Sequence, residues 1–204
     1  MMRKLLKDNR LQSHMIRIGI ILLLLFALQV TMLGHTSWSK EKAVEDWVQS
    51  MEMPPAKVVS EQVSPSGYHC ILLIDETHGM YHTVHLERQL LFWTNHGGTV
   101  SMPIKPDVLL SFRHGMTTLS KNKYLYYYLG QVSDPKIKRL AFYTELEGEQ
   151  PVDAQSGIYQ VVKEYSKQDV ERGSLKAKLR AYDTEDQLIY ELGIDDIEIR
   201  RSQQ

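Results

Sequence analysis

Histidine is the residue type in this sequence with the most chemical potential. Neutral imidazole is a common ligand of zinc and other transition metals, and its unperturbed pKa of about 6.5 also suits proton transfer. A group of histidines lies between positions 69 and 114: His69, His78, His82, His85, His96 and His114. A metal-assisted hydrolase built on segment 69–114 is therefore one functional hypothesis. Its candidate metal ligands are His78, His82, His85, His96 and His114.

The spacing of these histidines argues against a metal site within one element. His82 and His85 are three residues apart, so on a strand their rings point to opposite faces. His78 and His82 would share a helical face, but Gly79 favours a turn there. The sequence contains no His-Glu-x-x-His motif, and its single cysteine excludes a Cys-x-x-Cys pair. A site assembled across hairpins stays open; otherwise we expect surface histidines that make the domain pH-sensitive.

Other catalytic motifs are absent or lack their companions. Ser37-Trp-Ser-Lys40 and Ser133-Asp-Pro-Lys136 match the S-x-x-K pattern, but the S-D-N and K-T-G motifs that accompany it are missing. The sequence has no G-x-S-x-G elbow, no P-loop and no dinucleotide-binding fingerprint. An enzyme is therefore disfavoured without being excluded, and no cofactor is expected.

A run of tyrosines offers a candidate binding surface. In the segment from Tyr124 to Leu129, strand alternation places Tyr124, Tyr126 and Tyr128 on one face. If that face is open to water, the aromatic stripe suits a protein or glycan partner. We predict instead that the strand is buried on both faces, because tyrosine packs well on a pleated sheet.

The elements that position these side chains begin with an apolar run near the N-terminus. Ile18–Gly34 follows a head, residues 1–17, that carries five basic residues and one acid. At about 1.5 Å per residue the run covers roughly 25 Å, close to the ~30 Å hydrocarbon core of a bilayer. Basic residues resist translocation, so we predict one transmembrane helix with a cytoplasmic N-terminus and an extracytoplasmic C-terminal domain. A cleaved signal peptide is the alternative, although cleavage sites between Gln29 and Ser39 are poor.

Charge and cysteine content narrow the expected partners. The chain has 24 basic and 25 acidic residues, of which the head holds five and one, so the remainder has a net charge of −5. An acidic exterior gives no electrostatic basis for nucleic-acid binding. The expected partners are the lipid bilayer, through Ile18–Gly34, and an envelope protein or glycan. The lone cysteine, Cys70, lies in an apolar run and is expected to be buried.

Beyond the membrane the sequence changes from a helical to a strand-like pattern. Residues 35–56 are predicted to form a juxtamembrane amphipathic helix, with Trp47 packed on the domain, and a linker. Residues 57–192 predict many short strands separated by turns, and residues 193–204 form a polar tail. We therefore predict a mainly β fold, an antiparallel β-sandwich or partly open barrel. The leading function is a non-enzymatic binding or assembly module of the cell envelope.

One predicted turn also locates a buried ring. The glycines of the segment from Asn95 to Gly98 permit positive φ and a tight reversal. We expect at least one of Phe92 and Trp93 to be buried where that hairpin folds onto the sheet, and His96 to be exposed in the turn.

Three segments resemble those of a known group of proteins, the small extracytoplasmic β-rich proteins of spore-forming Gram-positive bacteria. Leu86–Gly98 is similar to their segment of a basic residue, Leu or Phe, Trp and Gly-Gly. Tyr128–Leu140 resembles their Gly and Asn/Asp-Pro segment, and Tyr182–Tyr190 resembles their last hairpin. The resemblance implies a signal, lipobox or anchor followed by a β domain, over roughly 57–192. It implies no functional residues, and this chain departs from the group in lacking a lipobox and in its many histidines.

Overall fold

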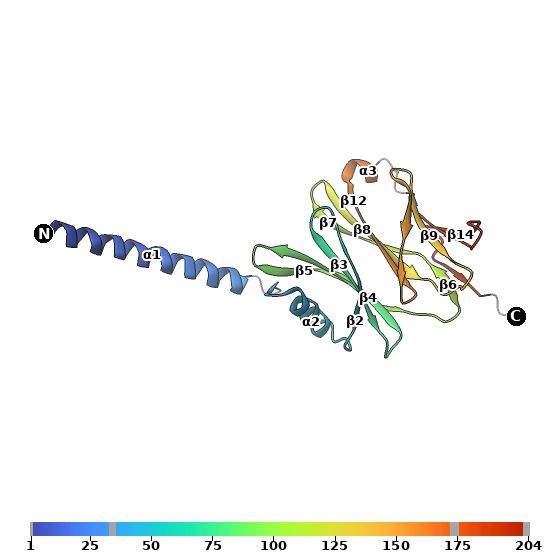
Figure 1. Ribbon diagram of the computed structural model, residues 1–204, viewed down its shortest axis with the longest axis horizontal. Coiled ribbons are helices and arrows are strands. Elements are labelled where there is room, and N and C mark those ends of the chain that lie inside the picture. Colours follow the sequence, from blue (N-terminus) through green and yellow to red (C-terminus); the bar gives the residue numbers. More distant parts are fainter. Residues whose placement is uncertain (1, 33–35, 172–175, 202–204) are drawn as a thin grey trace.

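The computed structural model describes residues 2–32, 36–171 and 176–201, except for the side chains of 2–11, 29–32, 100–101 and 171. Helix α1 (Met2–Met32) projects from one end of a β-rich body, and the C-terminus lies at the other end (Figure 1). The described residues also form helices α2 (Lys40–Ser50) and α3 (Lys167–Glu171).

Antiparallel pairing joins the described strands into four sheets. In spatial order, the helix-side sheet contains β1 (Thr36–Ser37), β5 (Phe92–Pro103), β4 (Met80–Gln89), β3 (Tyr68–Asp75) and β2 (Lys57–Val63). The central sheet contains β11 (Ala154–Gln155), β12 (Ile158–Ser166), β8 (Lys123–Gln131) and β7 (Arg113–Ser120). The outer sheet contains β10 (Gly148–Val152), β9 (Arg139–Thr144), β13 (Lys178–Tyr182) and β14 (Leu188–Gly193). The C-terminal ribbon contains β15 (Glu198–Arg200) and β6 (Val108–Ser111).

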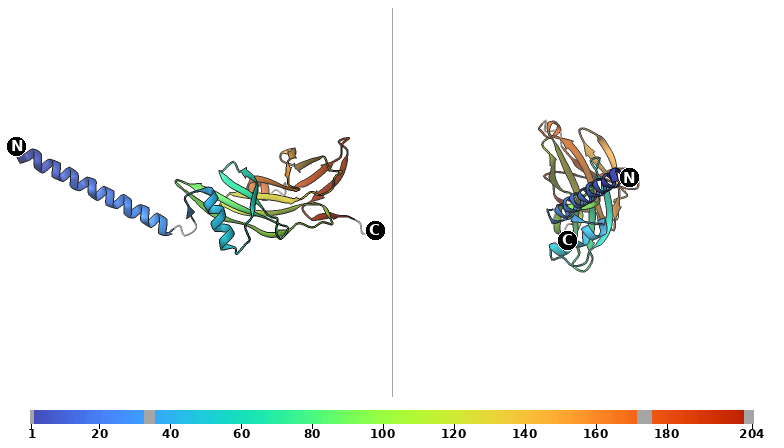
Figure 2. Two further views of the ribbon diagram at one scale, coloured as in Figure 1. Left: turned by 60° about the horizontal axis from the view of Figure 1, so that its bottom comes forward. Right: turned by 90° about the vertical axis from the view of Figure 1, so that its left-hand side faces the viewer.

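The central sheet is buried on both faces. On one face Leu129 and Ile158 pack with Leu72 and Ile74 of the helix-side sheet. On the other face the central sheet contributes Tyr128 to a core shared with the outer sheet. The mainly β, antiparallel prediction is therefore confirmed. The described strands stack in three layers and do not close into a barrel, and Figure 2 shows the body from two further directions.

Helix α2 covers the free face of the helix-side sheet, as predicted for the amphipathic segment. The Ser39 side chain caps its first turn by accepting a 3.1 Å hydrogen bond from the Lys42 backbone N–H. Its apolar face buries Val44 and Trp47 against a cluster that includes Leu73 of β3. The helix thus packs on the protein domain through the side chains that its sequence pattern selects.

The predicted turn from Asn95 to Gly98 is wrong, because β5 runs through it as one strand. The pairing of β4 with β5 shifts register between Val84 and Leu86. Their partners in β5 are Gly98 and Asn95, so the segment from Asn95 to Gly98 forms a bulge. Gly97 has a φ of +101°, and its backbone N–H donates a 2.7 Å hydrogen bond to Asn95 Oδ1. Gly98 lies so close to β4 that a Cβ there would be 1.9 Å from the Thr83 carbonyl oxygen. These glycines serve a bulge and a close strand approach, both of which resemble a turn in sequence.

The hairpin reverses instead at Leu90 and Leu91, between Gln89 and Phe92. Phe92 is buried with 4% exposure, which confirms the prediction of a buried ring, while Trp93 is half-buried. Leu90 has a φ of +55°, which is uncommon for a bulky residue. Sequence reasoning missed this turn because it lacks the usual Asn, Asp or Gly.

Two predicted boundaries also differ from the structure. The linker 35–56 contains β1, which adds to the edge of β5. The polar tail 193–204 contains β15, which pairs with β6. Both strands are very short and form by pairing with an edge in the folded domain, so their own sequences carry little strand signal.

The predicted span Ile18–Gly34 is helical as far as α1 extends, to Met32, and its remaining residues lie outside those described. Among the described residues, no helix combines the length and apolarity needed to cross a membrane.

Candidate functional site

The structure disperses the histidines that the sequence brings together. His78 pairs with Asp75 in the turn after β3, at 2.7 Å, and His114 lies on the exposed edge strand β7. His82 and His85 point to opposite faces of β4, as their spacing predicts, because Val84 and Leu86 face α2 whereas Tyr81 faces the central sheet. Across the described residues, no three His, Cys, Asp or Glu side chains are grouped to hold a metal ion.

His85 is enclosed between the helix-side and central sheets. It pairs in register with Cys70, and its ring meets the Tyr127 ring edge-on at 4.6 Å. Neither ring nitrogen has a hydrogen-bond partner in the described part of the chain. Burial lowers the pKa of His85 to about 4, and the nearby His96 acts in the same direction. His85 is thus a neutral core residue near pH 7.

His96 is exposed, as predicted, and lies on β5 at the rim of the same layer. Its Nε2 is 2.9 Å from Glu87, and its ring meets the Tyr68 ring edge-on at 5.2 Å. Cys70 is fully buried, as predicted, and burial raises the pKa of its thiol to about 12. The thiol therefore stays protonated near neutral pH and is a poor nucleophile.

Three tyrosines of β8, Tyr124, Tyr126 and Tyr128, share the face that is turned toward the outer sheet. Tyr128 is 1% exposed, and Tyr126 packs against the same cluster with its ring stacked at 6.3 Å from that of Tyr128. Tyr124 is half-buried at the end of the strand. On the opposite face Leu125 and Leu129 are buried. The described rings therefore act as core residues and present no open stripe.

A concave surface with a mainly apolar lining lies beside β7. A pocket of about 320 Å³ is lined mainly by apolar side chains from several strands and from the segment after β14. Its lining comprises Thr99, Met102, Phe112, Arg113, His114, Tyr127, Leu129, Ile194 and Ile197. A second, more open pocket of about 700 Å³ adjoins it at Arg113 and Ile197 and carries the acids Asp195 and Asp196. Together they form a groove, hereafter the β7 groove, that is apolar at one end and acidic at the other.

The edge of the sheet beside this groove is only half covered. β6 and β7 follow one another along the chain with Phe112 between them, and both lie beside β8. β15 covers the outer edge of β6, and the Phe112 backbone N–H donates a 2.8 Å hydrogen bond to the Ile197 carbonyl oxygen. Among the described strands, none pairs with the outer edge of β7. The chain thus supplies its own strand to one half of this edge and leaves the other half open.

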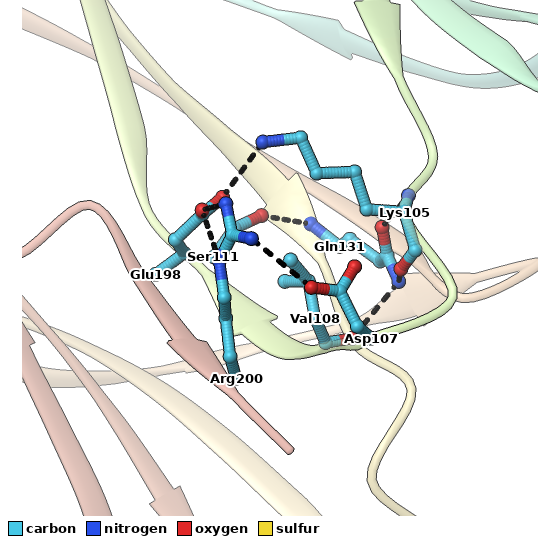
Figure 3. Close-up of polar contacts among 7 residues, drawn as sticks. All are labelled: Lys105, Asp107, Val108, Ser111, Gln131, Glu198 and Arg200. Carbon is cyan, nitrogen blue, oxygen red and sulfur yellow. Dashed lines mark hydrogen bonds and ion pairs between the residues drawn. The ribbon is translucent and has the colours of Figure 1, made fainter. Parts of the chain in front are cut away.

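A polar network fixes the covered half in place (Figure 3). Arg200 of β15 forms ion pairs with Asp107, at 3.1 Å, and with Glu198, while Lys105 reaches Glu198 at 3.3 Å. The Gln131 side chain donates to the carbonyl oxygens of Lys105 and Val108 and accepts a 2.8 Å hydrogen bond from the Lys105 backbone N–H. These contacts join both strands of the ribbon to each other and to the end of β8, next to the open half of the edge.

An apolar cluster marks the opposite end of the domain. The Phe92 ring packs at a tilt against Trp38 with centroids 4.6 Å apart, and both rings contact Phe26 of α1 at 6.1 and 5.9 Å. Leu90 and Leu91 extend from this cluster at the hairpin tip with exposures of 79% and 64%. Sequence reasoning missed this surface, because its members come from three separate segments.

Comparisons with protein-family models, curated proteins and solved structures found no match to this chain. The resemblance to extracytoplasmic proteins of spore-forming bacteria therefore stays a prediction.

Proposed function

We propose that this chain is a membrane-anchored, non-enzymatic binding module whose extracytoplasmic β domain takes an extended segment of a partner protein along the open edge of β7. The observation that carries the proposal is the half-covered edge: β15 pairs with β6 only as far as Ser111, and no described strand pairs with β7 beyond it. The anchor is Ile18–Gly34, with residues 1–17 on the cytoplasmic side.

The backbone of β7 supplies the main recognition chemistry. An edge strand presents unpaired N–H and C=O groups, which match those of another extended chain. β15 already uses this chemistry on the neighbouring half of the same edge. A partner strand on β7 would therefore extend an arrangement that the domain makes with its own chain.

The β7 groove supplies side-chain selectivity. Successive side chains of a docked strand point to opposite faces, so every second residue would face the pocket beside Met102 and Leu129. Those residues should be apolar. Asp195 and Asp196 at the adjoining rim favour a basic residue at one end of the segment.

Two observations support the anchor. The large apolar side chains of α1 between Met15 and Leu28 are exposed, from 42% at Phe26 to 68% at Leu23. From Ile20 to Phe26 they occupy consecutive positions of the helix, so no polar face remains to meet water along this part. The basic residues of the head precede the run, which favours a cytoplasmic N-terminus.

The test uses the full chain in lipid nanodiscs and a library of random short peptides. We expect enriched peptides to carry apolar residues at alternate positions and to slow hydrogen–deuterium exchange of backbone amides in β7. Ile197→Glu should weaken binding by at least about tenfold, because it places a charge in the apolar pocket. Leu146→Glu is the matched control, since Leu146 is 46% exposed and Ile197 is 51% exposed.

Three results would overturn the proposal. They are the absence of any enriched peptide, protection confined to strands other than β7, and equal effects of Ile197→Glu and Leu146→Glu. Protection of the β domain by soluble cell-wall glycan fragments and by no peptide would identify a glycan partner instead.

A further inference from the structure

We infer that the tip of the β4–β5 hairpin, together with Trp38, forms a second lipid contact that dips into the outer leaflet beside the anchor. This inference rests on the proposed anchor. It adds a lipid-facing surface on the β domain itself, formed by Trp38, Leu90 and Leu91 and hereafter called the tip surface.

The tip surface has a composition that suits lipid and not water. Two-residue hairpin turns in water usually carry Asn, Asp or Gly, whereas this one presents two leucines with exposures of 79% and 64%. Trp38 adds a third large exposed side chain at 64%, and tryptophan favours the boundary between hydrocarbon and water. Three such side chains gathered at one end form an exposed apolar patch.

Ring contacts place the tip surface alongside α1. Phe92, the residue after the tip, contacts Phe26 with ring centroids 6.1 Å apart. Phe26 precedes the end of α1 at Met32 by six residues, or roughly 9 Å along the helix axis. The tip surface therefore lies beside the C-terminal part of α1, and Figure 1 shows the β5 hairpin near that end of the helix.

The contact with Phe26 identifies lipid as the partner of the tip surface. If Ile18–Gly34 crosses the bilayer, Phe26 is the middle residue of the span, so a hairpin whose Phe92 contacts Phe26 extends from the outer surface into the hydrocarbon of the outer leaflet. The apolar surface of the tip is also continuous with that of α1, through the contacts among Phe26, Trp38 and Phe92. The exposed Arg88, two residues before the tip, is placed to reach lipid phosphate groups by snorkelling.

A second contact would also orient the domain. A single helix leaves an attached domain free to swing, whereas a helix and a hairpin fix two points on the membrane. The C-terminal ribbon, with β6, lies toward the other end of the body, so this orientation would direct it away from the lipid (Figure 1).

The test measures the depth of a fluorescent label. The full-length Leu91→Cys variant is labelled with an environment-sensitive nitrobenzoxadiazole and reconstituted into vesicles of phosphatidylcholine and phosphatidylglycerol. Cys70 does not compete for the label, because it is fully buried. Leu146→Cys, in the exposed turn between β9 and β10, carries the same label as the control.

We expect the label at position 91 to emit at shorter wavelength than the label at 146, and to be quenched by lipids brominated along their acyl chains. Adding Leu90→Asp to the Leu91→Cys variant should reduce that quenching several-fold, because a carboxylate resists insertion. Circular dichroism of each variant checks that the β domain is folded.

Flotation of the same vesicles separates the two proposals. If the protein floats with the lipid but the labels at 91 and 146 are equally exposed to water, the anchor stands and the tip surface does not contact lipid. If the protein fails to float, the anchor is wrong and the inference fails with it.

Discussion

Gly115 of β7 lies directly beneath the ring of Tyr127 on the neighbouring strand β8: a Cβ at Gly115 would be 2.1 Å from Tyr127 Oη and 2.2 Å from Cζ. The same hydroxyl accepts a 3.2 Å hydrogen bond from Thr99 Oγ1 of β5. Tyr127 therefore bridges the central and helix-side sheets while lining the β7 groove. The absence of a side chain at Gly115 is what lets the ring lie there.

The first prediction follows from this contact. Gly115→Ala should lower the free energy of unfolding by about 1–3 kcal/mol, because the added methyl group collides with the ring and forces it to move. Urea titration of the full chain in detergent micelles measures the change. In a Tyr127→Leu background the same substitution should cost much less, since the ring is gone. An equal cost in both backgrounds would show that the collision is not the cause.

The second prediction concerns the backbone of the hairpin tip. Leu90 has a φ of +55°, whereas Leu91 lies outside the left-handed region. An L-residue pays roughly 1–2 kcal/mol to adopt that conformation, and glycine costs about 0.5–1 kcal/mol in chain entropy. Leu90→Gly should therefore stabilise the domain by about 0.5–1 kcal/mol, and Leu91→Gly should destabilise it by a similar amount. Urea titrations of the two variants side by side test this, and two equal effects would contradict it.

The third prediction concerns pH. The pKa of His85 is lowered from 6.5 to about 4 in the folded chain. Above pH 6.5 the imidazole is neutral in both states, so it makes no pH-dependent contribution to stability. As pH falls from 6.5 toward 4, the unfolded chain binds the proton first, and the free energy of unfolding should fall by about 3 kcal/mol. Below pH 4 both states are protonated and this contribution levels off.

Urea titrations of wild type and His85→Gln at a series of pH values isolate that contribution. The variant should lose the His85 part of the pH dependence between 6.5 and 4, about 3 kcal/mol, and His82, whose pKa burial also lowers, contributes to what remains. His114→Gln serves as the control, because His114 is exposed on β7 and should leave the pH dependence unchanged. If the wild type is equally stable at both ends of this window, His85 is not held neutral by burial.

The fourth prediction concerns topology. Protease added to intact cells that carry the full chain should remove the β domain and leave a stub that contains Ile18–Gly34 in the membrane fraction. The reason is that the basic head favours a cytoplasmic N-terminus and leaves the domain outside. A peptide tag before Arg3 should survive the digestion, whereas a tag after Arg201 should be lost. A domain released without protease, with its N-terminus near Ser37, would instead establish a cleaved signal.

The sequence by itself determined the elements whose side-chain pattern is local. Helix α2 and strands β2 and β3 follow from the spacing of apolar residues, and so does the burial of Cys70 and Trp47. The opposite orientations of His82 and His85 follow from the period of a strand. Each of these depends on near neighbours along the chain, so no knowledge of the tertiary fold is needed.

Only the tertiary structure determined which side chains and strand edges from distant segments come together. Three rings from separate segments meet in one cluster: Phe26, Trp38 and Phe92. They meet only because β1 pairs with β5 and holds the C-terminal end of α1 beside the hairpin. The turn at Leu90 and Leu91 has no turn-forming residues and is imposed by the pairing of β4 with β5. The open edge of β7 exists because β15 begins only at Glu198, opposite Ser111 of β6, and no described strand pairs with the outer edge of β7. These features depend on pairings between distant residues, and a periodic pattern along one segment carries no information about them.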